Sequence, residues 1–280
     1  MLNYHVVDEV ACITLDRPPV NSLDLALRRA LIEAFRRAEA DFMARAVVLH
    51  GNGRGFCAGG DIGEFGTPAA SAAPALSADV HPVIEGMRKP VVAAIHGFAV
   101  GGGLETALVC HYRVVEADAR IGLPEVKLGT IPLSGTQRLP RLMSLSRTVD
   151  MIMAGEIAQA ERLAGTAMFD RVVAPGAALS SALELARHAD GLPLVRHRPL
   201  AADDGALATA RRKFANGTAA QRSALDAIAG AYAAADFDSG MLHARSLYNT
   251  LMAEDTVTTA RDRFLAGDRT DPADDGDTIR

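Results

Sequence analysis

The stretch that most constrains the fold of this chain runs from residue 89 to residue 138. It opens with the apolar run Val91–Ile95, whose length and valine content predict a buried strand. Three consecutive glycines, Gly101–Gly103, follow after a tight turn and precede a predicted helix at Leu104–Cys110. Glycines at a helix start let a ligand approach free backbone N–H groups at the positive end of the helix dipole. The pattern therefore predicts a binding turn between a strand and a helix.

Two acidic residues accompany this turn. Glu105 falls in the first turn of the predicted helix, and Glu125 follows beyond a predicted strand at Tyr112–Val115. Each has a structural interpretation, because an acid in the first turn complements the helix dipole and Pro124 followed by an acid is a common helix start. For either glutamate alone we favour the structural interpretation. For the two together, beside the glycines, we favour function.

A second glycine-rich loop, Gly51–Ile62, strengthens the functional interpretation. It follows a predicted strand at Arg45–His50 and contains Phe56-Cys57-Ala58-Gly59-Gly60-Asp61. This hexapeptide resembles the first oxyanion loop of the crotonase (enoyl-CoA hydratase/isomerase) superfamily, and Gly97–Glu105 resembles the second. The segments that follow also match, namely Pro124–Glu125, Leu128–Pro132 and Thr136–Pro140, so that the resemblance extends to about Gly267. The sequence of Arg120–Glu125 is most similar to that of the hydratase domain of multifunctional β-oxidation enzymes.

The resemblance implies an α/β fold, a crotonase-like superhelix of β-β-α units followed by a helical C-terminal oligomerisation region. We expect a core at 1–190, a helical region at 191–267 and a disordered, polar tail at 268–280. Further strands are predicted at Tyr4–Val7, Val10–Leu15 and Phe169–Val173, and a mobile loop at Gly66–Ala78. Helices are predicted at Asp24–Ala40, Leu139–Ala154, Gln159–Ala164, Ala177–Ala189, Gly205–Phe214, Ala219–Ala234, Ser239–Ala253 and Thr256–Leu265.

The amino-acid composition limits the classes of binding partner and the compartment that we expect for this chain. The net charge is −5 and no basic block occurs, which argues against nucleic acid or an anionic membrane as the main partner. Three scattered cysteines favour a reducing compartment, and without an evident signal peptide we expect a cytoplasmic protein. The sequence contains no run of about 18 apolar residues, so no membrane span is predicted. The eight histidines have no ligand spacing, so we expect no metal.

The resemblance also assigns roles to individual residues. The backbone N–H groups of Gly60 and Gly102 form the oxyanion hole, and Glu105 and Glu125 share the proton transfers of enoyl-CoA hydration. Glu125 is the residue that gives its proton to C2. Residues that contact the substrate are Ala58, Asp61, Ile62 and Leu133. The substrate is an acyl-CoA thioester, no separate cofactor is needed because coenzyme A is part of the substrate, and family members assemble as a homotrimer or a dimer of trimers.

One departure from the family pattern leaves alternatives open. The family commonly has Pro-Gly-x-Gly-Gly-Thr-Gln-Arg, whereas here Pro132 is followed by Leu133-Ser134-Gly135-Thr136, one residue shorter and with two fewer glycines. In hydratases the glycine after the proline offers its N–H to the catalytic water, and Leu133 retains an N–H. The alternatives are a Δ3-Δ2 enoyl-CoA isomerase or other enolate chemistry, and, in another class, a non-catalytic acyl-CoA-binding subunit.

Overall fold

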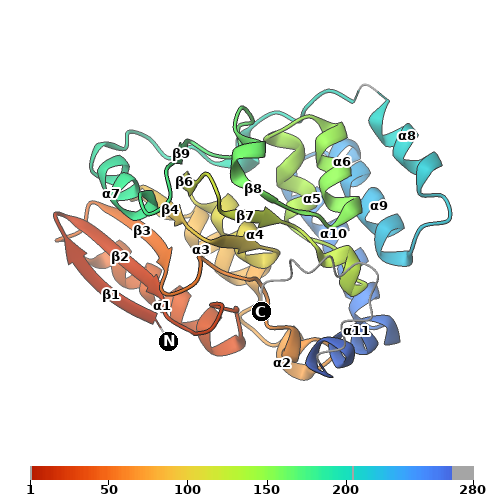
Figure 1. The fold of residues 1–280 in the computed structure, drawn as a ribbon, viewed down its shortest axis with the longest axis horizontal. Coiled ribbons are helices and arrows are strands. Elements are labelled where there is room, and N and C mark those ends of the chain that lie inside the picture. The colour runs from red at the N-terminus through yellow and green to blue at the C-terminus, as the bar shows by residue number, and fades with distance from the viewer. Residues whose placement is uncertain (1, 204, 267–280) are drawn as a thin grey trace.

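The computed structural model describes residues 2–203 and 205–266 (Figure 1). A six-stranded sheet with the order β1-β2-β3-β4-β6-β9 forms the larger layer, and a three-stranded sheet with the order β5-β7-β8 the smaller one. Within the larger sheet β1 and β2 form an antiparallel hairpin, and every later pairing is parallel. The larger sheet comprises β1 (Leu2–Val7), β2 (Val10–Leu15), β3 (Ala46–Gly51), β4 (Val91–Ile95), β6 (Tyr112–Glu116) and β9 (Arg171–Val173).

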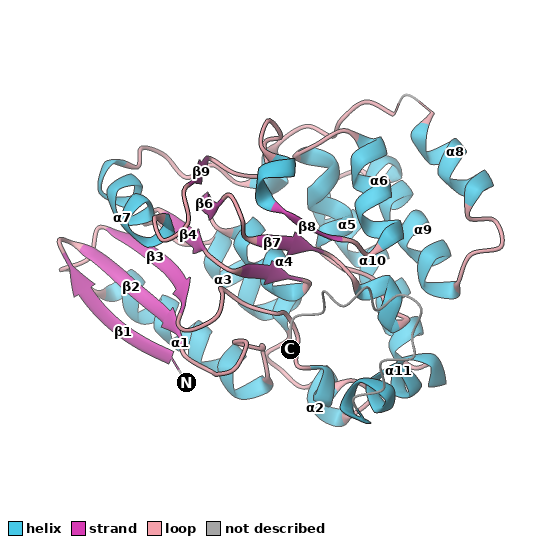
Figure 2. Cartoon of the chain, viewed as in Figure 1, coloured by secondary structure: helices cyan, strands magenta, loops and turns pink. Residues whose placement is uncertain are grey.

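Both faces of the larger sheet are covered, which explains the continuous apolar runs of its central strands. Alternate residues such as Val47 and Leu49 of β3 face the main core, whereas Val48 faces a smaller core. Ala182 and Ala186 of helix α7 (Ala178–His188) close that smaller core. The predicted class, a superhelix of strand pairs and helices, is confirmed (Figure 2).

The smaller sheet joins three short strands, β5 (Phe98–Val100), β7 (Arg120–Gly122) and β8 (Ile157–Gln159). β5 and β7 pair in parallel, and β7 and β8 pair antiparallel. Gly122 must lack a side chain, because a Cβ there would lie 2.5 Å from the Glu156 carbonyl oxygen. This sheet matters for function because β5 leads directly into the glycines that precede helix α4 (Gly102–Val109).

Helices pack on these sheets as their apolar periodicity predicts. Helix α1 (Leu25–Ala40) begins at Asp24, whose Oδ1 accepts the Leu27 N–H at 2.7 Å, and it buries Leu31 and Phe35. The remaining helices are α2 (Pro68–Ser71), α3 (His81–Glu85), α5 (Gly135–Arg138), α6 (Leu145–Ala154), α8 (Ala206–Lys213), α9 (Ala219–Ala233), α10 (Phe237–Met252) and α11 (Asp255–Ala266).

The C-terminal helices return to the chain's own core. Helix α10 packs on α9 and α5, and α11 contacts two 3-10 turns, η1 (Ile62–Glu64) and η3 (Glu125–Leu128). In Figure 1 the larger sheet lies at the left, and α8, α9 and α10 lie at the right. The division at residues 190 and 191 stays a prediction. The predicted tail at 268–280 lies outside the described residues.

Three sequence predictions are wrong in detail. The helix predicted at Leu139–Ala154 is two elements, a 3-10 turn, η4 (Leu139–Arg141), and α6, which begins where Ser144 caps it. In the helix predicted at Gln159–Ala164, the first residue instead ends β8 and only Ala160–Leu163 form a 3-10 turn, η5. The predicted loop Gly66–Ala78 contains α2 and the start of a π-helical turn, η2 (Leu76–Val80). Short elements like these leave little periodicity to detect.

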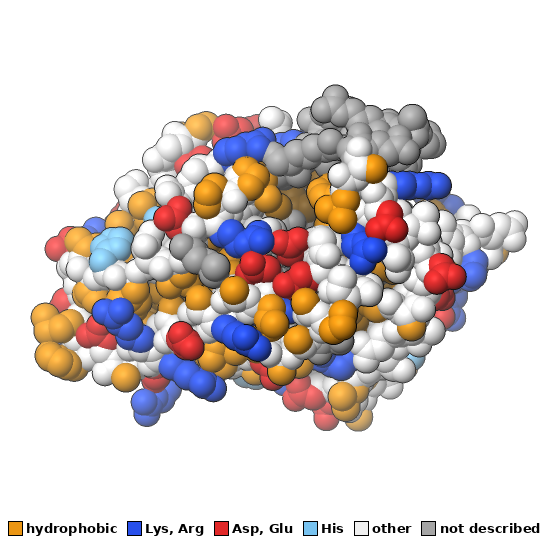
Figure 3. All heavy atoms as spheres, turned by 90° about the horizontal axis from the view of Figure 1, so that it is seen from below, with side chains coloured by type: hydrophobic (Ala, Val, Ile, Leu, Met, Phe, Trp, Pro, Cys, Tyr) orange, Lys and Arg blue, Asp and Glu red, His pale blue; other side chains and the backbone are white. Residues whose placement is uncertain are grey.

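The surface carries mixed charge. Figure 3 shows the molecule from below, and on this face acidic and basic side chains are interspersed, with no broad area of one sign. Across the described residues, no helix combines the length and apolar character that a membrane crossing requires.

Candidate active site

The two glycine-rich loops are joined through their backbones. Phe56 donates its N–H to the Phe98 carbonyl oxygen at 2.9 Å, and Val100 donates to the Cys57 carbonyl oxygen at 3.0 Å. The loops approach so closely that a Cβ on Gly103 would lie 2.3 Å from the Cys57 carbonyl oxygen. The sequence therefore uses glycine here because two stretches of backbone must touch.

This junction exposes two backbone donors next to each other. A Cβ on Gly102 would lie 3.4 Å from the Gly60 nitrogen, so the two residues are neighbours across the junction. Within residues 2–203 and 205–266, neither the Gly60 N–H nor the Gly102 N–H has a hydrogen-bond acceptor. Two preorganised N–H groups in this arrangement can stabilise negative charge on a carbonyl oxygen.

Glu105 lies in the first turn of α4 and is 6% exposed. Its Oε1 accepts the N–H groups of Ser134 and Gly135, each at 2.7 Å. Burial raises the pKa of the Glu105 carboxyl, and hydrogen bonds from Gly135 and Ser134 and the nearby Arg138 charge oppose that rise. The described residues give Oε2 no partner, which leaves one oxygen available for chemistry.

Glu125 reaches the same helix start from η3. Gly101 has a φ of 55°, and a Cβ at this position would lie 2.8 Å from the Glu125 Oε1. The Glu125 residue is partly exposed, but its Oε2 is buried and has no hydrogen-bond partner among the described residues. Burial, and secondly the charge of Glu105, raise the pKa of Glu125 well above its ordinary value. The structure thus brings the two predicted glutamates together as an interacting pair.

The four predicted substrate contacts have different surroundings. Ala58 is half-buried and donates its N–H to the Val20 carbonyl oxygen at 3.0 Å. Asp61 caps η1 through the Gly63 N–H and forms an ion pair with Arg17 at 2.8 Å, so its carboxylate is already engaged. Ile62 is half-buried in η1, directly after Gly60 and Asp61.

Leu133 is 5% exposed and lies in the turn that leads to Ser134. Its N–H has no acceptor in the part of the chain that the structure describes. The shortened segment after Pro132 therefore still offers a free donor, while the next two N–H groups hold Glu105.

Sequence reasoning missed three residues of this region. Leu76 of η2 reaches the oxyanion junction, since a Cβ on Gly102 would lie 2.8 Å from its Cδ2. Tyr248 of α10 lies close to both glutamates, and burial, followed by their charges, raises its pKa to about 12. Ser134 was noted only as part of the departure from the family pattern. Leu76 and Tyr248 reach the site through tertiary packing of distant segments, which no local motif signals.

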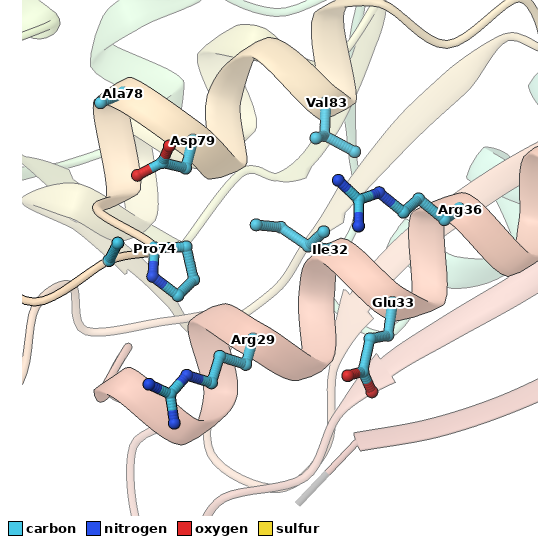
Figure 4. A pocket seen from close by; sticks show the side chains of 9 residues that line it. Arg29, Ile32, Glu33, Arg36, Pro74, Ala78, Asp79 and Val83 are labelled. Carbon is cyan, nitrogen blue, oxygen red and sulfur yellow. The ribbon is translucent and has the colours of Figure 1, made fainter.

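A surface groove of about 470 Å³ lies apart from these residues (Figure 4). It runs between α1 and the segment 73–83, and none of its lining residues is a predicted site residue. In Figure 4, Arg36 extends towards Val83, and Arg29, Ile32 and Glu33 line the groove from α1. The groove therefore lies behind the segment that carries Leu76, not at the glutamates.

The family model for enoyl-CoA hydratase/isomerase matches residues 6–200. This range includes both glycine loops, Glu105, Glu125 and the turn at Ser134. The chain belongs to the enoyl-CoA hydratase/isomerase family. The hypothesis drawn from its motifs is thereby confirmed at the level of the family.

The chain is similar to proteins that are named as enzymes. The chain is 44% identical over 202 residues to the peroxisomal bifunctional enzyme of Danio rerio, a match covering 71% of this chain and 27% of the relative. It is 41% identical over 152 residues to the probable enoyl-CoA hydratase of Bacillus subtilis (strain 168), covering 52% of this chain and 59% of that protein. The chain therefore spans about a quarter of the length of the fish enzyme.

The fold is shared with solved structures of the family. The enoyl-CoA hydratase subunit I of Geobacillus kaustophilus HTA426 superposes with a TM-score of 0.62 at 26% identity, covering 95% of each chain. Within the described residues of this family member, no group of three or more His, Cys, Asp or Glu side chains is arranged to hold a metal ion.

Proposed function

We propose that this protein is an enoyl-CoA hydratase, which adds water across the double bond of a trans-2-enoyl-CoA. The observation that carries the proposal is the pair formed by Glu105 of α4 and Glu125 of η3, next to two unpartnered backbone N–H groups. A hydratase needs two proton-handling groups and an oxyanion site, and this arrangement supplies both.

The oxyanion site accounts for the first part of the chemistry. When water adds at C3, negative charge moves to the thioester oxygen to give an enolate. The N–H groups of Gly60 and Gly102 would donate to that oxygen, and losing one such donor typically costs roughly 2.7–4 kcal/mol. Because both donors belong to the backbone, they need no side chain, and glycine lets the thioester approach them.

The glutamate pair accounts for the second part. Two carboxyls that repel each other in a buried site titrate apart, so that one stays protonated while the other is charged. Burial raises the pKa of both carboxyls, the charge of Glu105 adds to the rise at Glu125, and donors from Gly135 and Ser134 stabilise the charged form of Glu105. Glu105 would therefore accept a proton from the attacking water, and Glu125 would deliver a proton to C2.

The free Leu133 N–H suits the position of that water. It follows Pro132 and immediately precedes the two N–H groups that hold Glu105 Oε1. We propose that Leu133 donates to the water, and that Ala58, Asp61 and Ile62 contact the CoA ester from the first loop. The engaged carboxylate of Asp61 limits its contribution to its backbone.

Turnover of crotonyl-CoA and decenoyl-CoA by the purified protein tests the proposal, followed as loss of the enoyl absorbance. Glu105→Gln and Glu125→Gln should each lower kcat by about 10²–10⁴, the usual contribution of a general acid or base. Exposed Glu161→Gln is the control and should leave kcat unchanged. CoA esters that bind without turnover would contradict hydration.

The same two variants separate the alternatives, with a 3-enoyl-CoA as the substrate for the isomerase. A Δ3-Δ2 enoyl-CoA isomerase, or another enolate chemistry using one acid, should tolerate one of the two glutamine variants. A non-catalytic acyl-CoA-binding subunit should bind esters of every chain length and turn over none. The two buried glutamates favour the hydratase over both.

Three further properties belong to the proposal. The hydration described above needs no metal or separate cofactor, because its proton transfers use carboxyls and coenzyme A arrives with the substrate. We propose a cytoplasmic location and a homotrimer or a dimer of trimers. Light scattering of the purified full chain tests the assembly, and a monomer would contradict it.

A further inference from the structure

Ser134 carries a buried hydroxyl that the structure leaves without a partner. The residue is 0% exposed, and its Oγ forms no hydrogen bond with any described residue. Burying a hydroxyl without a hydrogen bond costs free energy of folding. An unpaired buried hydroxyl in a native protein therefore indicates a further role for that group. The departure from the family pattern places this serine where the pattern has glycines.

The backbone N–H of Ser134 lies against Glu105, so its side chain starts beside that carboxylate. The Ser134 N–H donates to the Glu105 Oε1 at 2.7 Å, and the adjacent Gly135 N–H donates to the same oxygen at 2.7 Å. The turn itself is fixed, because Thr136 donates its N–H to the Pro132 carbonyl oxygen at 3.0 Å and its hydroxyl to the Leu133 carbonyl oxygen at 2.9 Å. A serine whose backbone holds one carboxylate oxygen can reach that carboxylate with its hydroxyl by rotation about χ1.

The charged and titratable groups around Glu105 do not themselves decide which of the two glutamates carries the charge. Arg138 of α5 is the cation near it, but it already forms a buried ion pair with Glu85 at 2.8 Å. Glu125 of η3 opposes a negative charge on Glu105, and Tyr248 of α10 stays neutral. The neutral donors of the turn are therefore the groups that can decide which glutamate is charged.

We propose that Ser134 is a positioning residue that donates both its backbone N–H and its hydroxyl hydrogen to Glu105, and so keeps Glu105 as the charged member of the glutamate pair. Glu125 then keeps the proton that it delivers to C2. This inference rests on the proposed hydratase function for its kinetic consequences, but not for the protonation states themselves.

Ser134→Ala tests the proposal, with Thr148→Val as the matched control. Thr148 of α6 carries an equally buried, equally unpartnered hydroxyl outside the site. Removing the donor from Ser134 should favour the protonated form of Glu105, so the acidic limb of the kcat–pH profile should move upward. The expected shift is about one pH unit, a roughly tenfold loss of kcat on that limb, with KM within about twofold. Ser134→Thr, which keeps the hydroxyl, should restore the profile.

A second measurement separates this proposal from the proposed function. Infrared titration of the carboxyl bands, assigned with Glu105→Gln and Glu125→Gln, reports protonation without turnover. An upward shift of the Glu105 titration in Ser134→Ala supports the proposal even if the wild type hydrates nothing. Unchanged titration and an unchanged pH profile would overturn it. Loss of kcat at every pH without a shift, or unfolding of Ser134→Ala, would assign Ser134 a structural role and would also overturn it.

Discussion

The two walls of the candidate site are built in opposite ways. The first wall consists of the glycine loops Gly51–Gly60 and Gly97–Gly103, which meet through backbone hydrogen bonds. The second wall consists of the segment 61–80, on which α10 and α11 pack from the C-terminal region. Each wall contributes to the oxyanion junction, the first through Gly60 and Gly102 and the second through Leu76.

The first wall is tightly packed where its two loops meet. A Cβ on Gly97 would lie 2.1 Å from the Arg54 carbonyl oxygen, and a Cβ on Gly103 would lie 2.3 Å from that of Cys57. Backbone atoms cannot turn aside as the end of a side chain can. The oxyanion donors are therefore held before a substrate arrives, which is how such donors act most strongly.

Side-chain contacts hold the second wall. Arg28 of α1 donates to the carbonyl oxygens of Pro74 and Ala69, each at 2.9 Å, and to the Glu64 carboxylate at 2.9 Å. At the C-terminal side, Arg261 donates to the Phe65 carbonyl oxygen at 2.9 Å. The groove of Figure 4 lies behind this wall, lined by Pro74 and other residues of 73–83.

The difference separates two tasks. Under the proposed function, the first wall would hold the reacting carbonyl through Gly60 and Gly102, where misplacement would reduce the rate. Under the proposed function, the second wall, held by a few side chains and bordered by the surface groove, would be the part that adjusts to acyl chains of different length. Chemistry and substrate range should therefore respond to different mutations.

The largest effect is expected from Gly103→Ala in the first wall. The new Cβ meets the Cys57 carbonyl oxygen, so stability should fall by at least the ~1–3 kcal/mol typical of overpacking, and activity should fall with it. Gly60→Ala is the matched control in the same wall, since its Cβ would meet only the Phe65 ring at 3.5 Å. Denaturant unfolding measures both. Equal stability of the two variants would show that the first wall is not rigid.

Arg28→Met should affect the second wall next. It removes the donor to the Glu64 Oε2 and to three carbonyl oxygens, two of them in the segment 61–80, so this segment should loosen and bind substrate less well. We expect KM to rise about tenfold, which corresponds to ~1.4 kcal/mol, with a smaller change in kcat. Steady-state kinetics measure this, and Arg29→Met, an exposed neighbour in α1, is the control. A larger loss in kcat than in binding would contradict the division of tasks.

Gly102→Ala probes the line where the walls meet. Its Cβ would lie 2.8 Å from the Leu76 Cδ2, the flexible end of a side chain in the second wall. The variant should lose part of its kcat/KM, and adding Leu76→Ala should recover it, with a coupling energy of about 0.5–3 kcal/mol. The double-mutant cycle is measured as kcat/KM on crotonyl-CoA and decenoyl-CoA for the wild type, the two single variants and the double variant. Strictly additive losses would show that Leu76 does not bear on Gly102.

The sequence predicted the first wall far better than the second. Short glycine-rich and acidic motifs, each within a few residues of sequence, contain Gly60, Gly102, Glu105 and Glu125. The structure brings all four to one place. The superhelix followed from the same motifs. The helix boundaries near Leu139 were wrong because a proline-containing 3-10 turn and a new cap interrupt one apolar period.

Leu76, Arg28 and Tyr248 were out of reach of sequence reasoning for a physical reason. Each contributes through contacts between segments distant in the chain, and each has an ordinary local role as a loop, helix or core residue. Ser134 was visible only as a deviation from the family pattern. Its bond to Glu105 depends on how the shortened turn folds.

The smallest effect concerns the stability that the chain loses by holding Glu125 close to Glu105, beside the first wall. Burial raises the folded-state pKa of Glu125 above the ordinary value of 4.5. Between those two pKa values the unfolded chain binds fewer protons at Glu125 than the folded chain does. The contribution of Glu125 to the free energy of unfolding is therefore most favourable below about pH 4.5, and it is lost as the pH rises through the raised pKa. Glu125→Gln should therefore melt higher than wild type at pH 8, by about 2–4 °C for each 1 kcal/mol relieved, with little gain near pH 4. Thermal melts across pH measure this, beside the exposed control Glu161→Gln, which should follow wild type. If Glu125→Gln were no more stable than wild type at pH 8, the glutamate pair would not destabilise the fold, and the comparison of the two walls would rest on their packing alone.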